Sequence, residues 1–179
     1  MDKGALKMDS DIIFARTSVR NYTDEDVSES DVRDILAAGM AAPSAMNQQP
    51  WEFWVVRDPE RRALLANSSP YAQPCGRAPL VIVTCMKTAN IRMPEMAPQD
   101  MGACCENILL EATRLGLGAV WQATYPDAKR MGKVASAIRL TNSDNLVPFS
   151  LIAAGHPAHQ QAATGPKHFE RSRIHTEFA

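Results

Sequence analysis

Basic and hydroxyl side chains gather near both ends of this chain. Residues 16–20 read RTSVR and residues 171–173 read RSR. In an extended segment, residues two apart point to one side, so Arg16, Ser18 and Arg20 would converge. Arginine forks match phosphate oxygens and keep their charge at all ordinary pH values. The pattern indicates a phosphate site, and the alternative is a solvated surface with ordinary ion pairs.

A second polar segment, residues 42–51, reads APSAMNQQPW. Prolines bracket it, and Gln49 is expected to be extended because it precedes Pro50. A stiff loop that carries Ser, Asn and Gln supplies fixed hydrogen-bond donors and acceptors. The segment is therefore either a ligand-binding loop or an ordinary connector from a helix to a strand.

The common phosphate-binding loops are absent from the sequence. The pair Gly116-x-Gly118 follows a predicted helix, and position 121 is Trp, so a dinucleotide fingerprint fails on context and on spacing. There is no Walker loop and no G-x-S-x-G elbow. Any phosphorylated cofactor must therefore be held by side chains.

Apolar periodicity and capping residues predict the elements that position these segments. Ser28 is expected to begin a helix that ends near Ala41–Pro43, and Asp58-Pro59 to begin another. The other predicted helices are Asp9–Arg16, Asp100–Leu115 and Asp127–Ile138, and the predicted strands are Trp51–Arg57, Leu80–Cys85, Gly118–Ala123 and Val147–Ala154. The strand Leu80–Cys85 should be buried on both faces. Alternation of strands and helices indicates an α/β or α+β sandwich.

Composition favours one domain with a hydrophobic core. The chain has 179 residues, of which 45% are apolar, and its 19 basic and 20 acidic residues nearly balance. This balance argues against a nucleic-acid binder. No apolar run is long enough for a signal peptide or a membrane span. The four cysteines lack C-x-x-C spacing, which favours reduced thiols and a cytoplasmic location.

Taken together, four motifs resemble those of the nitroreductase family. They are RTSVRNY, APSAMNQQPW, GLGAVWQATYP and a basic SRIH near the end, and their order and spacing match from about Asp9 onward. The resemblance implies an FMN-binding α+β fold: a three-layer sandwich with a central, mostly antiparallel sheet flanked by helices. It also implies a homodimer with two flavins at the interface and a C-terminal segment exchanged between subunits. Residues 1–8 would be a flexible leader and 9–179 a single domain.

The resemblance assigns roles to the motif residues. The implied cofactor-binding residues are Arg16, Thr17, Ser18, Arg20, Pro43, Ser44, Ala45, Asn47, Gln49, Trp121, Gln122, Ala123, Thr124, Arg171 and Arg173. The first arginine cluster and the C-terminal arginines should meet the phosphate and ribityl chain, and the loop after Pro43 should reach the flavin of the other subunit. Residues 121–124 should run beside the ring, with a backbone N–H near its N5 atom. Two departures are Thr17, where many relatives have Arg, and His168, where a second basic residue is common.

The implied activity is transfer of hydride from NADH or NADPH to FMN and then to a small acceptor such as a nitroaromatic or a quinone, in a ping-pong scheme. Because the flavin carries the chemistry, no catalytic protein residue is required. Arg20 beside the pyrimidine end would favour the reduced, negatively charged flavin. The alternatives are other chemistry on the same fold (dehalogenation, enone reduction), a non-catalytic flavin module, or a domain without a cofactor.

Several other residues have two interpretations each. His156 and His159 could suggest a metal pair, but no third ligand accompanies them, so no metal is expected. Cys104 and Cys105 are expected to fill the core. The stretch Thr88–Gln99 is predicted to be a loop whose methionines, at 93 and 96, either shape the acceptor pocket or lie on a mobile surface.

Overall fold

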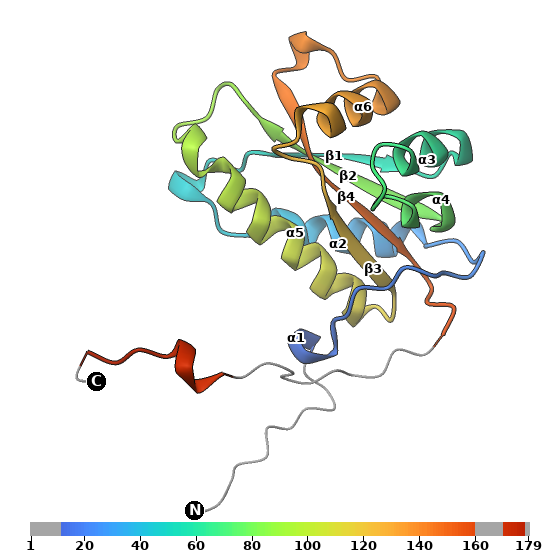
Figure 1. The fold of residues 1–179 in the computed structure, drawn as a ribbon, viewed down its shortest axis with the longest axis horizontal. Helices are drawn as coiled ribbons and strands as arrows, with labels where there is room; N and C mark the ends of the chain where they lie inside the picture. Colours follow the sequence, from blue (N-terminus) through green and yellow to red (C-terminus); the bar gives the residue numbers. More distant parts are fainter. Residues whose placement is uncertain (1–11, 160–169, 178–179) are drawn as a thin grey trace, which may run out of the picture.

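A central antiparallel sheet organises the protein, which a computed structural model describes over residues 12–159 and 170–177. Its strands are β1 (Trp51–Val56), β2 (Leu80–Lys87), β3 (Gly118–Ala123) and β4 (Leu146–Gly155). They lie in the order β1-β2-β4-β3, and every neighbouring pair is antiparallel (Figure 1). β3 is therefore an edge strand, which leaves one side of its backbone available to other groups.

Helices cover both faces of the sheet and complete the three-layer sandwich implied by the family resemblance. One face packs against α2 (Glu29–Met40) and α5 (Ala97–Arg114), and the other against α3 (Pro59–Ala66), α4 (Pro74–Arg77) and α6 (Ala128–Ile138). Successive residues of β2 alternate between the two cores: Leu80 and Ile82 belong to the first, Val81 and Val83 to the second.

Burial of β2 on both faces confirms the prediction made from its continuous apolar run. Such runs are typical of parallel sheets, because crossover helices cover both faces there. Here the sheet is antiparallel, and the same composition arises because separate helical layers cover its two sides.

Capping side chains start three of the helices, and for the first two of them the cap was predicted. The side chains of Ser28, Asp58 and Asp127 each accept a hydrogen bond from the backbone N–H three residues later, at 3.1, 2.9 and 3.0 Å. The first two precede α2 and α3, and the third precedes α6. These caps satisfy backbone donors that the first helical turn leaves free.

The predicted boundaries need correction in a few places. The loop predicted for Thr88–Gln99 contains a 3-10 turn, η2 (Pro94–Met96), and α5 begins at Ala97 rather than at Asp100. Pro98 fits there because the first turn needs no backbone donor from it. The short helix α4 was not predicted, and strand β2 extends to Lys87.

The chain ends fall partly outside the described residues. The first helix, α1, spans Ile12–Ala15, whereas the predicted helix began at Asp9. The predicted leader 1–8 and His168 lie outside the described residues. A 3-10 turn, η4 (Arg171–Arg173), is described near the C-terminus. None of the helices in the described ranges combines the length and the apolar character needed to cross a membrane.

Candidate functional site

The N-terminal segment docks onto the outer edge of β3. Ser18 forms a parallel bridge with Ala119, and the Val19 N–H donates to the Ala119 carbonyl at 3.0 Å. Gly118 makes the approach possible, because a Cβ built there would lie 2.6 Å from the Val19 side chain. Gly118 of the GLGAVWQATYP motif is therefore needed for the RTSVRNY motif to pack against β3.

Side chains of the docked segment alternate between two sides, as an extended backbone requires. Thr17 and the buried Val19 line a pocket of about 370 Å³ beside the C-terminal end of α5. Ser18 and Arg20 are exposed, and Arg20 lines a different pocket. Arg16 instead forms an ion pair with Glu106 of α5 at 3.4 Å, a partner that sequence reasoning missed.

Arg20 and three predicted residues of β3 share a pocket of about 470 Å³. It lies between the sheet edge and α4, and Arg130 of α6 closes one side. Its lining residues are Arg20, Pro70, Tyr71, Gln73, Pro74, Arg77, Val120, Trp121, Gln122, Ala123 and Arg130. We call it the edge pocket. The structure therefore brings together parts of the first and third motifs, more than 90 residues apart in sequence.

Gln122 carries an unsatisfied donor at this pocket. The residue is 6% exposed, and its Oε1 accepts from the Cys75 thiol at 3.4 Å. Its Nε2 has no hydrogen-bond partner within the described residues. Buried polar groups nearly always have partners, so an orphaned amide lining a pocket indicates a place for a ligand acceptor.

The backbone of β3 adds donors at the same place. The Ala119 carbonyl accepts from the Val19 N–H and therefore points away from β4. In an antiparallel strand the backbone groups of every second residue point to the same side, so those of Trp121 and Ala123 also point to this outer edge. The Ala123 carbonyl accepts from Arg130 at 3.4 Å. The N–H groups of Trp121 and Ala123 accordingly face outward. This geometry agrees with a backbone donor beside a planar ligand.

Three guanidinium groups make the edge pocket electropositive. Arg77 donates to the Asn21 side chain at 3.3 Å, and Arg20 donates to the Ser18 carbonyl at 3.2 Å. Arg130 pairs with Asp127 at 3.3 Å and lies 5.6 Å from the centre of the Tyr71 ring. Because Asp127 neutralises only one of them, the pocket favours a ligand with negative charge.

The proline-bracketed loop lies at the other end of α5. The Ala45 N–H donates to Oδ1 of Asp100 at 2.9 Å, and Nε2 of Gln48 donates to Oδ2 at 2.7 Å. The Gln48 amide also binds the Met93 backbone twice, accepting from its N–H at 2.9 Å and donating to its carbonyl at 3.0 Å. Asp100 is 5% exposed. We call this arrangement the Asp100 clamp.

The clamp holds an unusual backbone. Met46, Asn47 and Gln49 all have positive φ, at 51°, 51° and 46°. The prediction that Gln49 is extended is therefore wrong: its N–H turns back to the Ser44 hydroxyl at 3.1 Å, which closes the loop. Non-glycine residues in this region cost energy and are concentrated at functional sites.

Within one chain, the loop and the edge pocket are separate. Pro43, Ser44, Ala45, Asn47 and Gln49 belong to the clamp region at the start of α5, whereas Thr17 lies beside the end of that helix (Figure 1). None of these loop residues lines the edge pocket of the same chain.

The remaining predicted residues lie apart from the edge pocket. Thr124 is buried, and its N–H donates to the Phe149 carbonyl at 3.1 Å. Arg171 and Arg173 are exposed in η4, which lies away from the sheet in Figure 1, and Arg173 pairs with Glu170 at 2.7 Å. The structure does not bring the C-terminal arginines to Arg16.

Cysteines and histidines have structural environments. All four thiols are free and buried, which confirms Cys104 and Cys105 as core residues. Burial raises the pKa of Cys75 to about 12 and that of Cys105 to about 11. His156 lies 3.7 Å from Glu25. Over residues 12–159 and 170–177, no group of three or more potential metal ligands is found.

Comparisons with known proteins place these features in one family. The model of the nitroreductase family matches residues 13–75 and 69–156. A protein of Archaeoglobus fulgidus, named as a candidate NADH dehydrogenase/NAD(P)H nitroreductase, is 37% identical over 93% of this chain and 95% of its own.

Two solved structures are similar along most of their length. A candidate NADH oxidase from Clostridium acetobutylicum has a TM-score of 0.88 and 41% identity, over 93% of this chain and 99% of that one. A candidate nitroreductase from Desulfovibrio desulfuricans, solved in complex with FMN, has a TM-score of 0.72 and 36% identity, over 83% and 85%. With the family model matching most of the sequence, these findings show that the chain belongs to the nitroreductase family.

Proposed function

We propose that this protein is an FMN-dependent oxidoreductase that takes hydride from NAD(P)H and reduces small acceptors, such as nitroaromatics or quinones, in a ping-pong scheme. The observation that carries the proposal is the edge pocket, where Arg20 and the unpartnered Gln122 amide meet the open side of β3. The relative solved with FMN supports the choice of cofactor.

The residues at the edge pocket fit FMN. A flavin ring carries acceptors along its pyrimidine edge and at N5, and the pocket supplies the Gln122 Nε2 and the outward N–H groups of β3. Arg20 would lie by the pyrimidine edge. Arg16, Thr17 and Ser18 would hold the phosphate and ribityl chain, and Arg171 and Arg173 of the tail would join them. The bound flavin would accept and donate hydride.

Arg20 is the residue for which charge has the clearest consequence. Its guanidinium is exposed at the pocket and is held by the Ser18 carbonyl. A fixed cation beside the pyrimidine end stabilises a negatively charged reduced flavin more than a neutral oxidised one. Arg20 therefore makes reduction by the donor more favourable without taking part in proton transfer.

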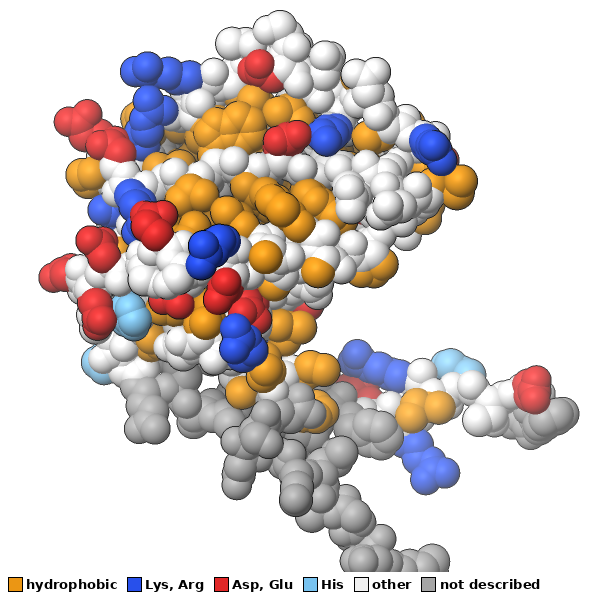
Figure 2. Space-filling view, turned by 180° about the vertical axis from the view of Figure 1, so that it is seen from behind, with side chains coloured by type: hydrophobic (Ala, Val, Ile, Leu, Met, Phe, Trp, Pro, Cys, Tyr) orange, Lys and Arg blue, Asp and Glu red, His pale blue; other side chains and the backbone are white. Residues whose placement is uncertain are grey.

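We further propose a homodimer in which each flavin contacts both subunits. No residue of the loop from Pro43 to Gln49 lines the edge pocket of its own chain, so a second copy would present this loop to the flavin. Met40, which ends α2, and Met46, in the loop itself, are 49% and 62% exposed, and Val55 of β1 is 41% exposed. Figure 2 shows apolar side chains gathered on one face of the molecule, as expected where a partner binds.

The chain ends fit the same arrangement. We propose that the C-terminal segment is exchanged between subunits, so that Arg171 and Arg173 reach the partner's phosphate site. Residues 9–179 would then act as one domain. The four free, buried cysteines agree with a reducing, cytoplasmic environment, which we also propose.

The first experiment is the visible spectrum of the purified protein with mass identification of the released cofactor, followed by anaerobic titration with NADH and NADPH. We expect a yellow protein that contains FMN and is bleached by a nicotinamide donor. A protein that stays colourless after FMN is added would refute the proposal. Reduction that is slow with both donors would favour a non-catalytic flavin module, and screening acceptors against the reduced protein separates nitroreduction from dehalogenation.

Arg20→Ala tests the assigned role of that side chain. We expect the variant to bind FMN with a lower reduction potential and to be reduced more slowly, because the cation near the pyrimidine end is lost. Potentiometric titration of both proteins measures this directly. Arg33→Ala, on the opposite side of the sheet, is the control, and an unaltered potential in Arg20→Ala would contradict the assignment.

A further inference from the structure

A second pocket adjoins the edge pocket. It measures about 500 Å³ and lies between the end of α3 and the start of α6. Pro70, Gln73 and Arg130 line both pockets, so the two spaces share a wall. A ligand that extends out of the edge pocket past Arg130 would enter this second pocket.

Cations dominate the second pocket. Lys129, Arg130 and Lys133 of α6 line it, and Asp127 is its one acidic lining residue. Arg130 pairs with Asp127 at 3.3 Å, and the Lys133 ammonium donates to the Asn67 carbonyl at 3.1 Å. No hydrogen bond or ion pair engages the Lys129 ammonium in the described part of the chain, so its charge is available to a ligand.

Ser68 adds a hydroxyl group to the wall of the second pocket. The residue is 5% exposed and lines the pocket, and its N–H donates a hydrogen bond to the Leu65 carbonyl at 3.0 Å. Its hydroxyl makes no hydrogen bond to any residue that the structure describes. This hydroxyl is therefore able to donate a hydrogen bond to a ligand in the pocket or accept one from it.

The combination of a hydroxyl with lysine and arginine is the chemistry that binds phosphate oxygens. We propose that this second pocket binds the phosphate groups of the nicotinamide dinucleotide donor, an inference that rests on the proposed function. The nicotinamide ring must enter the edge pocket to reach the cofactor, and its phosphates must then lie close by. The shared wall at Arg130 and Gln73 puts the cationic pocket next to that position.

The decisive variant is Lys129→Glu. It reverses the charge of an exposed side chain that forms no ion pair in the described part of the chain and makes the smallest contribution to the lowered pKa of Asp127, so we expect the fold to be retained. In anaerobic stopped-flow reduction, we expect the apparent Kd for NADPH or NADH to rise by about tenfold, while the limiting rate of reduction is retained. Ser68→Ala should raise the same Kd by about threefold.

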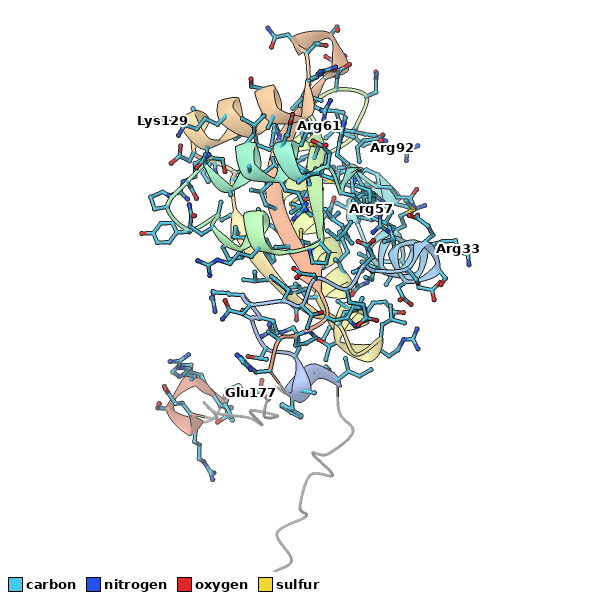
Figure 3. The ribbon with its side chains drawn as sticks, turned by 90° about the vertical axis from the view of Figure 1, so that its right-hand side faces the viewer. Arg33, Arg57, Arg61, Arg92, Lys129 and Glu177 are labelled. Carbon is cyan, nitrogen blue, oxygen red and sulfur yellow. The ribbon has the colours of Figure 1, made fainter. Side chains whose placement is uncertain are left out.

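Arg33→Glu is the matched control, because it changes the net charge equally. Figure 3 shows Lys129 and Arg33 on opposite sides of the molecule, on α6 and α2. The control should leave the donor Kd within about twofold of the wild-type value, since long-range steering is screened by salt. An equal effect in both variants would overturn the proposal.

Two further measurements distinguish the phosphates of the nicotinamide donor from the phosphate of FMN as the group that this pocket binds. Reduced nicotinamide riboside carries the reacting ring without phosphate, so Lys129→Glu should not change its Kd. The affinity for FMN, measured by fluorescence on refilling the protein, should also be unchanged. A loss of FMN affinity in place of donor affinity would show that the pocket serves the cofactor phosphate and would refute the donor assignment.

Binding of inorganic pyrophosphate, measured by calorimetry, tests the pocket without any turnover. We expect the purified protein to bind it in competition with the donor, and Lys129→Glu to abolish that binding. Absence of binding to the wild-type protein would refute the site. If the protein proved to bind no flavin, the proposed function would fail, and pyrophosphate bound through Lys129 would still report the anion pocket.

Discussion

The Asp100 clamp and the edge pocket use their polar groups in opposite ways. In the clamp, both carboxylate oxygens of Asp100 and both ends of the Gln48 amide find partners inside the chain. In the edge pocket, the Gln122 Nε2 and the outer N–H groups of β3 remain available. The first region is fully satisfied without a ligand, and the second is not.

This difference separates a part that is shaped in advance from a part that is completed by binding. The hydrogen bonds of the clamp hold a loop with three positive φ angles, so the loop has its conformation without a bound partner. The edge pocket has donors without acceptors, and these lower the stability of the protein when no ligand is bound. Stability measurements on the empty protein should therefore respond oppositely in the two regions.

The largest effect is expected from Asp100→Ala. The change leaves the Ala45 N–H and the Gln48 amide without their buried acceptor, and we expect the free energy of unfolding to fall by about 3 kcal/mol. Urea denaturation of the empty protein measures it. Gln99→Ala, an exposed neighbour in the same helix, should change stability by less than about 0.5 kcal/mol. A loss below about 1 kcal/mol in Asp100→Ala would mean that the clamp does not hold the loop.

Gln122→Leu should act in the opposite direction on the empty protein. Removing the orphaned amide is expected to raise the free energy of unfolding by about 1 kcal/mol, because a buried donor without a partner disappears. The same change should weaken FMN binding by about tenfold, or about 1.4 kcal/mol. Urea denaturation and fluorescence titration measure the two effects. If FMN binds equally well to both proteins, Gln122 does not face the ligand.

Cys75 gives the smallest effect, and it depends on pH. Burial raises its pKa from 9.0 to about 12, so the unfolded chain loses the thiol proton first. The stability contributed by this thiol is fully present below pH 9 and is lost as the pH rises toward 12. Between about pH 8 and about pH 9.5, the stability advantage of the wild type over Cys75→Ala should shrink by about 0.8 kcal/mol.

Urea titrations at the two pH values check this prediction. Cys75→Ala is the reference for the wild type, because the other three thiols are present in both proteins. A constant difference across this range would mean that the folded and unfolded Cys75 thiols ionise alike.

Local signals predicted much of the fold. The caps at Ser28 and Asp58, the helix that starts at Asp127 and the limits of β3 were predicted correctly, because each depends on a few adjacent residues. The start of α5 was placed three residues late because the run before Asp100 is polar and contains prolines. Helix α4 was missed because four residues that include Pro and Gly carry no periodicity.

The site was harder to predict because its contacts are distant in sequence. Alternation correctly separated Ser18 and Arg20 from Val19, but nothing near Arg16 pointed to Glu106, 90 residues away. The conformation of Gln49 was predicted from its following proline, and the hydrogen bond to Ser44 overrode that preference. The Asp100 clamp joins three separate segments, which no local pattern could indicate.

The open side of β3 has a consequence for handling the protein. Val19 packs against Gly118 at the beginning of this strand, whereas no strand among the described residues pairs with the outer side of the stretch from Trp121 to Ala123. An uncovered strand invites pairing with another polypeptide, which leads to aggregation. A cofactor that lies along this stretch would act as a protective cover, and preparations stripped of it would be the ones that precipitate.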